Sequence, residues 1–318
     1  MESHYTKNVS QCVYIALFTV MIATSTAFGG IAVTIENDYF GDSDDNYSHG
    51  TEIEWSHSPE IIKDGVFRIG YGLNQLLFTP SKISNPTPPS QNERPWAGTM
   101  SLYRETWRIN QHDEQIRTRL EIGVLGPSSQ ADYSQKKVHE WLGCKTPMGW
   151  HHQMPDEPMV NVHQDCYMKL AEWIVVNRTG FDWTAVYGGT IGTTYINARG
   201  GLMARFGYNL PAQAGLGDIA PKNDKPLKSR IFLYSFAEAT GVLAVHNATL
   251  SNSMFRDRKT GQERNIEHFL DVYRYGVAVG WDSFRLSYQW EDRGEEFKGE
   301  TDSGMSYGIL KIEFTTVF

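Results

Sequence analysis

The sequence predicts an all-β protein, a twelve-stranded antiparallel transmembrane β-barrel with a short helix in an extracellular loop. Three observations lead to this fold class. An apolar run typical of a signal peptide lies near the N-terminus, ahead of segments that alternate apolar and polar residues. Aromatic residues make up 13% of the chain, and tyrosine and tryptophan recur on the apolar faces of those segments. The chain ends on an aromatic residue, Phe318, at the close of one such segment.

The first 27 residues are expected to be a signal peptide. Residues 13–23 form an apolar run that is too short to span a bilayer comfortably. Ser25 and Ala27 are small residues at the positions that a signal peptidase reads, so we expect cleavage after Ala27 and a mature barrel over residues 28–318. No later segment has 18 uninterrupted apolar residues, so we expect no membrane-spanning helix.

Charge and cysteine content narrow the possible functions. The formal net charge of −8 argues against a nucleic-acid partner. The mature chain keeps two cysteines, Cys144 and Cys166, which could pair in an oxidising compartment. One possible pair does not make a disulfide framework, so we expect the sheet and not cross-links to hold the fold.

The alternating segments favour a barrel over a soluble sandwich. Arg117, Arg119 and Glu121 alternate with apolar residues, and residues 284–291 and 310–318 follow the same pattern. A sandwich also alternates, but with a signal peptide and aromatic-rich apolar faces these charges are expected to line a wet lumen. We expect strands at residues 30–40, 48–58, 66–78, 97–110, 114–125, 159–176, 182–196, 200–209, 229–247, 266–280, 282–294 and 303–318.

Loop lengths predict which end of the barrel faces outward. If both ends of the mature chain lie in the periplasm, residues 41–47, 79–96 and 126–158 are extracellular, which matches the long outer loops of such barrels. Residues 210–228 break this rule as a long inner connection. Within residues 126–158, we expect the short helix over 134–142.

Polar side chains gather where the first hairpin turns. Asn37 and Asp38 end the first strand and Ser48 begins the second, so an amide, a carboxylate and a hydroxyl converge at the outer rim. Because neighbouring residues point to opposite faces of a strand, Asp38 is expected to face the lumen and Asn37 the lipid.

The predicted helix carries the second group of candidates. Gln135 and His139 are four residues apart and share one helix face. An imidazole beside a carboxylate is a plausible general base, because its intrinsic pKa lies near neutrality. For a lone histidine the competing interpretation is an ordinary surface residue.

Short motifs follow one another along the chain: Glu36-Asn37-Asp38, Tyr47-Ser48-His49-Gly50, Phe78-Thr79-Pro80, Glu93-Arg94-Pro95-Trp96-Ala97-Gly98, Gly123-Val124-Leu125-Gly126-Pro127, Gln135, His139, Gly143, Gly149-Trp150, Gln153, Glu157-Pro158 and Glu295-Glu296-Phe297. Their number and order resemble the outer-membrane lipid A 3′-O-deacylase family. The resemblance implies a bacterial outer-membrane enzyme with lipid A, the anchor of lipopolysaccharide, as its substrate. It also implies calcium as the cofactor and removal of a 3′-O-linked acyl chain by ester hydrolysis. We expect a monomer.

The resemblance also implies roles for individual residues. His139 matches the catalytic histidine, Asn37 and Asp38 match an Asn-Asp pair, and Ser48 stands where the family has threonine or serine. In the implied mechanism His139 takes a proton from water, which attacks the ester carbonyl, while calcium and nearby donors stabilise the oxyanion. Calcium prefers oxygen ligands, so Asp38 is the first candidate metal ligand.

Some positions depart from the family pattern. One branch has a glutamate shortly after the histidine, where this chain has Lys145, and Glu157 is a possible substitute. That branch also has a functional lysine in the second outer loop, where Lys82 lies near but out of clear register. Arg94 is expected to anchor a strand at the membrane interface, where it could meet a phosphate.

Two other functions stay open. The first is a non-enzymatic barrel that acts as a narrow channel or as a stabiliser of the envelope. The second is a surface-binding protein that uses its outer loops, which the modest loop lengths disfavour.

Overall fold

The computed structural model describes residues 28–38, 46–112, 114–211, 231–251, 253–255, 261–281, 283–301 and 304–315. The predicted signal peptide, Phe318 and most of the 210–228 connection lie outside these residues. The strands are β1 (Phe28–Asn37), β2 (Asn46–His57), β3 (Glu60–Ile62), β4 (Gly65–Thr79), β5 (Ala97–Asn110), β6 (Gln115–Leu125), β7 (Glu157–Val176), β8 (Thr179–Gly192), β9 (Tyr195–Tyr208), β10 (Phe232–Asn247), β11 (Phe269–Trp281), β12 (Phe284–Arg293) and β13 (Met305–Thr315). The helical segments are η2 (Pro127–Ser129), α2 (Ala131–Leu142) and η3 (Trp150–His152).

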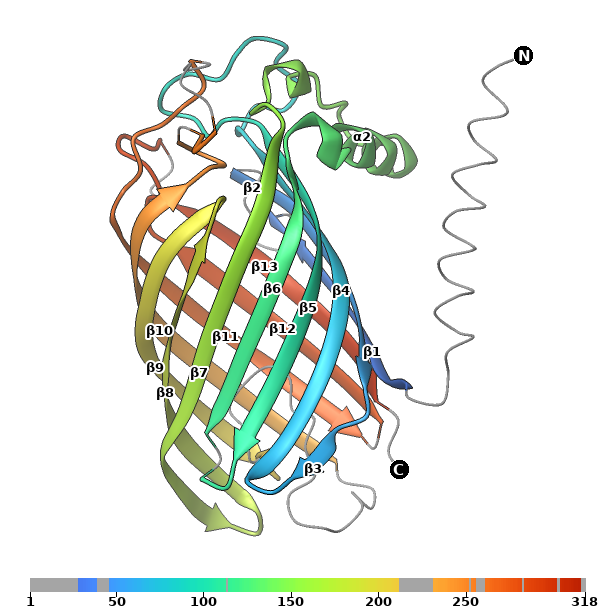
Figure 1. The fold of residues 1–318 in the computed structure, drawn as a ribbon, viewed down its shortest axis with the longest axis vertical. Helices are drawn as coiled ribbons and strands as arrows, with labels where there is room; N and C mark the ends of the chain where they lie inside the picture. The colour runs from blue at the N-terminus through green and yellow to red at the C-terminus, as the bar shows by residue number, and fades with distance from the viewer. Residues whose placement is uncertain are drawn as a thin grey trace, which may run out of the picture.

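The strands close into a barrel (Figure 1). β1 pairs with β2 on one side and with β13 on the other, while β2 pairs directly with β4. β3 is a three-residue strand that pairs with β4, so twelve of the thirteen described strands form the closed ring. Closure lets every strand donate and accept ladder hydrogen bonds on both sides, which a lipid environment demands. The predicted twelve-stranded antiparallel barrel is confirmed.

Helices contribute little to this architecture. Among the described residues, no helix is both long and apolar enough to cross a membrane. The predicted helix over 134–142 is present as α2, which begins three residues earlier than expected.

Two strands differ from their expected positions. The sequence places them at 182–196 and 200–209, but β8 and β9 begin earlier, at Thr179 and Tyr195. The hairpin before β8 turns at Asn177 and Arg178, whose φ angles of 42° and 71° are both positive. A two-residue hairpin turn requires this geometry, and without a glycine the pair gives a weak signal in the sequence.

Ion pairs fill much of the lumen. Glu105 accepts hydrogen bonds from Arg117 and Arg119, with both pairs at 2.7 Å between Nε and Oε2. Arg205 and Asp182, both fully buried, are joined by two hydrogen bonds of 3.0 and 2.6 Å. Removing one partner of such a pair leaves a buried charge without compensation. The charged strand faces therefore pair with one another inside the lumen, here between neighbouring strands.

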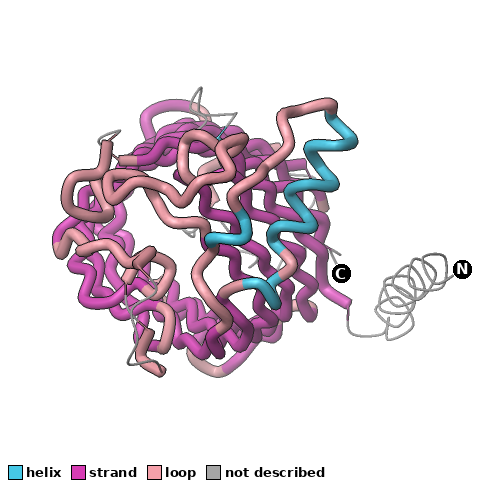
Figure 2. Tube along the Cα trace, turned by 90° about the horizontal axis from the view of Figure 1, so that it is seen from above, coloured by secondary structure: helices cyan, strands magenta, loops and turns pink. Residues whose placement is uncertain are grey.

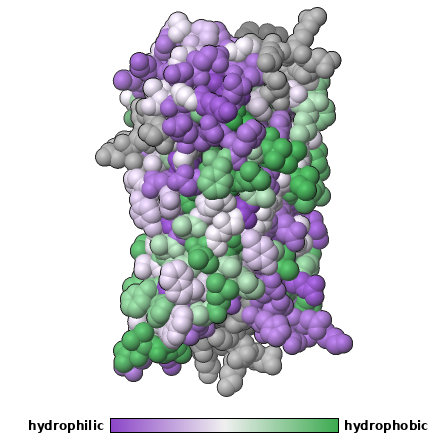
Figure 3. All heavy atoms as spheres, turned by 90° about the vertical axis from the view of Figure 1, so that its left-hand side faces the viewer, coloured by the Kyte–Doolittle hydropathy of each residue, from purple (hydrophilic) through white to green (hydrophobic). Residues whose placement is uncertain are grey.

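The opposite strand faces are apolar. Leu102 is 61% exposed and Ile122 is 58% exposed, and both alternate with lumen-facing residues on their strands. Figure 3 shows hydrophobic residues over the wall of the barrel and hydrophilic residues gathered at its upper end. An apolar belt below a polar rim is the surface of a membrane-embedded barrel.

Outer loops are tied together above the lumen by a set of residues that we call the rim cluster: Arg94, Thr249, Glu296 and Glu300. Arg94 pairs with Glu296 from the β12–β13 loop and donates to Thr249 Oγ1 at 3.0 Å from the β10–β11 loop. Figure 2 looks down on these loops at the end of the barrel. Arg94 is only 1% exposed and its guanidinium lies over the Phe78 ring, so the expectation that it meets a phosphate at the membrane interface is wrong.

The two carboxyl groups of the rim cluster have pKa values shifted in opposite directions. Burial opposes ionisation of Glu296, but the guanidiniums of Arg94 and Arg293 hold the pKa of its carboxyl below the ordinary value. Glu300 accepts a hydrogen bond from the backbone N–H of Glu296 at 2.7 Å, while its Oε1 is buried without a partner. Burial raises the pKa of Glu300 to about 7 from a model-compound value of 4.5.

This shift predicts a pH-dependent stability. Because the folded protein binds the Glu300 proton more tightly than the unfolded chain does, the free energy of unfolding falls as pH rises from 4.5 to about 7. Glu300→Gln is therefore expected to raise the unfolding temperature at pH 8 and to change it little at pH 4.5. Heat-modifiable migration of the detergent-solubilised barrel on gels, scanned with temperature at both pH values, measures this. An equal effect at both pH values would contradict it.

Candidate active site

Helix α2 packs on the outside of the barrel wall, not in its mouth. Side chains alternate along β4, so Leu77 points outward because Phe78 beside it faces the lumen. Leu77 is nevertheless only 1% exposed, since it packs with Trp96, Ala131 and Trp150. The 126–158 loop thus folds back over the outer face of β4 and β5, and Figure 1 shows α2 projecting beyond the wall at the upper end.

Close approach of the helix depends on a glycine. Gly98 of β5 faces outward, and a Cβ there would overlap both the Cβ of Ala131 and the Oγ of Ser129. Gln75 of β4 fixes the same corner by donating to the Ser129 carbonyl at 2.7 Å. The start of α2 is therefore fixed against the wall by shape and by a hydrogen bond.

Gln135 and His139 have different roles in the structure. Gln135 is 4% exposed and accepts a 2.7 Å hydrogen bond from the Trp150 indole, so it holds α2 to the η3 segment. His139 is partly exposed one turn later, and its Nδ1 lies 2.6 Å from the carbonyl oxygen of Lys145. A carbonyl only accepts, so Nδ1 carries the proton and Nε2 presents its lone pair. This tautomer suits a general base.

The turn after α2 creates that contact. Gly143 adopts a left-handed φ of 72°, and its N–H and that of Cys144 both bond the His139 carbonyl. The chain therefore reverses and brings the Lys145 carbonyl back to the imidazole. The Lys145 side chain, which replaces a glutamate of one family branch, is not part of this contact.

Asn37 and Ser48 meet across the first hairpin. A register shift in β2 between Tyr47 and His49 leaves Ser48 as an extra residue opposite β4. The Asn37 amide donates to the Ser48 carbonyl at 2.9 Å, and the Ser48 hydroxyl lies 2.5 Å from that of Thr79. These groups lie at the outer end of β1, β2 and β4, beside the strands on which α2 rests.

His49 is a residue that the sequence analysis did not single out. It pairs directly with Asn37 across β1 and β2, with 3.4 Å between Asn37 Nδ2 and His49 Nδ1. Its Nε2 lies 2.6 Å from Thr51 Oγ1. Cross-strand pairing in the hairpin is the signal that could have identified it. We call Asn37, Ser48, His49 and Thr79, together with His139 of α2, the outer-wall site.

The other predicted positions lie around this site. Asp38 directly follows β1 and is 5% exposed, and Glu157 is equally buried at the start of β7. Lys82 and Lys145 are exposed. Cys144 is exposed and Cys166 is buried, and both are free, so the possible disulfide is not formed.

The donor set at the outer-wall site suits a hard cation in type. Asn37, Ser48 and Thr79 supply amide, hydroxyl and carbonyl oxygens on the outer side of the wall. Within the described ranges, no group of three or more His, Cys, Asp or Glu residues is arranged to hold a metal ion. Amide, hydroxyl and carbonyl oxygens are ligands of the type that calcium takes.

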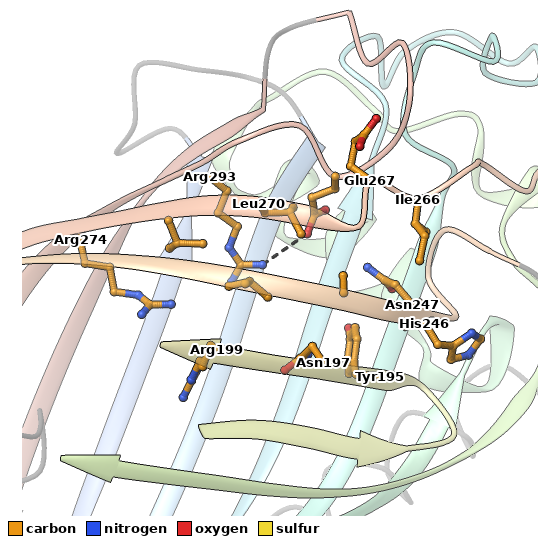
Figure 4. Close-up of a pocket in the computed structure, with 14 residues that line it drawn as sticks. Tyr195, Asn197, Arg199, His246, Asn247, Ile266, Glu267, Leu270, Arg274 and Arg293 are labelled. Carbon is orange, nitrogen blue, oxygen red and sulfur yellow. Dashed lines mark hydrogen bonds and ion pairs between the residues drawn. The ribbon is translucent and has the colours of Figure 1, made fainter. Parts of the chain in front are cut away.

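A cavity of about 130 Å³ lies inside the barrel under the outer loops (Figure 4). Arg199, Arg274 and Arg293 line it, and each is already paired with a carboxylate: Asp165, Glu238 and Glu291, respectively. Because these guanidinium charges are balanced within the lumen, the cavity is a continuation of the ion-pair network. The candidate active site is therefore the outer-wall site.

Comparison with known proteins identifies the family. The family model described as outer membrane protein LpxR matches residues 11–316. The chain belongs to this family. It is accordingly an outer-membrane protein, as its apolar belt and closed strand ring require.

A solved structure agrees on the fold. The LpxR family structure from Salmonella typhimurium superposes with a TM-score of 0.75 at 16% identity, over 91% of this chain and 100% of that one. The β-domain of the Bordetella autotransporter BrkA gives a TM-score of 0.47 at 12% identity, over 91% and 100%. Among curated proteins, none matches the sequence.

The docking of α2 makes a testable prediction. Gly98→Val is expected to lift the helix from the wall, because an inserted side chain at a packed contact costs about 1–3 kcal/mol. Trypsin should then cut the folded barrel faster at Lys136 and Lys137 of α2. Gly200→Val is the matched control, since a Cβ at this strand glycine meets open space. Equal cleavage rates in the two variants would argue against the docking.

Proposed function

We propose that this protein is a calcium-dependent lipid A deacylase that hydrolyses the 3′-O-linked acyl ester in the outer leaflet. The observation that carries the proposal is the packing of α2 on the outward face of β4 and β5. It puts His139, with Nε2 as the available base, outside the barrel at the end where the lipid headgroups lie. Membership of the LpxR family supports the choice of substrate.

The reaction is an ester hydrolysis. A water gives its proton to His139 Nε2 while its oxygen bonds to the acyl carbon. The bond from that carbon to the sugar oxygen then breaks, and His139 returns the proton to the leaving oxygen. The products are a free fatty acid and a lipid A hydroxyl. The Lys145 carbonyl stabilises the charged imidazole between these steps, because Nδ1–H keeps donating to it.

Polar groups on the hairpin complete the site. The carbonyl oxygen of the ester gains negative charge as water attacks, and hydrogen-bond donors fixed in advance stabilise it. Asn37 and Ser48 are held at the rim by their mutual contact and by Thr79. Bound calcium, with Asp38 as its proposed carboxylate ligand, would supply further positive charge for the oxyanion.

The structure favours the enzyme over a channel. A channel needs a continuous wet lumen, but here arginine–carboxylate pairs line the interior, Arg119 reaches from β6 to Glu52 of β2, and the rim cluster ties the outer loops above it. The polar groups of the outer-wall site lie on the other side of the wall, where a channel would have no use for them.

Replacing the base tests the proposal. His139→Ala is expected to lower deacylation by about 10²–10⁴-fold, the usual contribution of a general base, while the barrel stays heat-modifiable. Mass spectrometry of lipid A from expressing cells reports the loss of one acyl chain. His268→Ala is the control, because His268 is an exposed histidine bonded to Ala244 on another part of the rim. Lipid A that is identical in wild-type and empty-vector cells would reject the enzyme altogether.

Metal removal tests the cofactor separately. Dialysis of the purified barrel against a calcium chelator is expected to abolish deacylation, and added calcium is expected to restore it. Asp38→Asn should raise the calcium concentration needed for half-maximal activity, because the site loses its carboxylate. Full activity after exhaustive chelation would exclude calcium while leaving the role of His139 intact.

A further inference from the structure

One stripe of α2 changes from buried to exposed along the helix. Ala131, Gln135, Val138 and Leu142 are spaced by three or four residues, so their side chains share one face. Their exposed fractions are 1%, 4%, 42% and 64% in that order. The face that packs on the wall at the start of the helix therefore continues beyond the wall at its end.

The free part of this face is apolar. We call residues 138–142 the overhang. Val138 and Leu142 belong to the stripe, and Trp141, three residues after Val138, is 86% exposed. Exposing large apolar side chains to water costs free energy. A helix that presents several of them on one face is therefore expected to contact an apolar partner or a membrane.

The opposite face of α2 is charged. Lys136 pairs with Asp132 at 3.6 Å, and Lys137 pairs with Glu140 at 2.5 Å, all with exposed side chains. A charged face opposite an apolar face that carries tryptophan and leucine is the pattern of a helix that lies in a membrane interface.

The apolar stripe is continuous with the lipid-facing belt of the barrel. Gly98, on which α2 rests, and Leu102 are both outward residues of β5, four positions apart. Leu102 is 61% exposed, and Ile122 on the neighbouring strand lies directly opposite it. The space beside the wall under the overhang is thus the space that the outer ends of lipid chains occupy.

We propose that the overhang inserts Trp141, Leu142 and Val138 among acyl chains of the outer leaflet. In this position α2 is an interfacial helix that fixes how deep the outer-wall site lies in the membrane. His139 follows Val138 and lies between the stripe and the charged face. This consequence rests on the proposed function: the helix holds the His139 imidazole at the depth of the esters that join acyl chains to a sugar.

A dye on Cys144 tests the insertion without any activity measurement. Cys144 is exposed two residues after the helix ends, and a Cys12→Ser, Cys166→Ser background makes it the single labelling site. The labelled barrel is placed in phosphatidylethanolamine–phosphatidylglycerol vesicles with chains brominated near the glycerol. Quenching by these lipids is expected. Quenching by aqueous iodide instead, or by neither agent because protein covers the overhang, would overturn the proposal.

A double variant tests what the insertion does. Trp141→Ser with Leu142→Ser is expected to abolish the lipid quenching and to slow deacylation of lipid A in vesicles. The slowing should reach at least about tenfold, since losing one buried side chain of this size changes an equilibrium by that factor. In detergent micelles, where no bilayer sets the depth, the rate should stay near that of the wild type. An equal loss in both media would mean that these residues do not act through the membrane.

A control variant and the wild-type measurements distinguish failure of the proposed function from failure of the inserted helix. Ile61→Ser removes a side chain that is 72% exposed on β3 at the other end of the barrel, and both readouts should be unchanged. If wild-type protein shows lipid quenching but no deacylation, the proposed function fails and the inserted helix stands. If it deacylates without lipid quenching at Cys144, the inserted helix fails alone.

Discussion

The pairing of β1 with β13 closes the barrel, and closure fixes on which side of the wall each strand residue lies. Even-numbered positions of β4 and odd-numbered positions of β5 point into the lumen, so carboxylates and arginines meet there and neutralise one another. The remaining positions face lipid, where an unpaired polar group is costly. Uncompensated polar groups outside the wall are therefore best tolerated at the rim, and that is where Asn37, Ser48 and His49 lie.

An enzyme on the outer face of a barrel needs a second surface opposite its wall, and here α2 supplies it. The helix is held by three different contacts: the glycine at position 98, the Gln75–Ser129 hydrogen bond and the Gln135–Trp150 hydrogen bond. None of them involves His139. The base is thus positioned by residues at the other end of the helix and by the turn at Gly143, so its own side chain can face water and substrate.

Alternation, together with the apolar N-terminal run, the aromatic-rich apolar faces and the terminal aromatic, predicted the barrel, and the sequence also indicated the helix in the third outer loop and the polar end of the first hairpin. Local turn geometry was not predicted, because Asn177 and Arg178 make a tight hairpin without glycine, so that β8 begins earlier than expected. Contacts between distant segments were also out of reach. Nothing near Arg94 in the sequence indicates Glu296 as its partner, and Gly98 does not reveal that a helix rests on it. These pairings exist only once the ring closes.

The rim cluster also decides where the surface of this protein can vary. Arg94, Thr249 and Glu296 come from three different loops, so an insertion beside any of them would pull on the other two. Residues 84–88 are exposed throughout and lie on the same loop as Arg94 but away from its ion pair. Sequence changes are tolerated best where the backbone is solvated and loosely packed. The buried Arg94 side chain thus couples changes near Thr249 and Glu296, whereas residues 84–88 on its own loop can change independently.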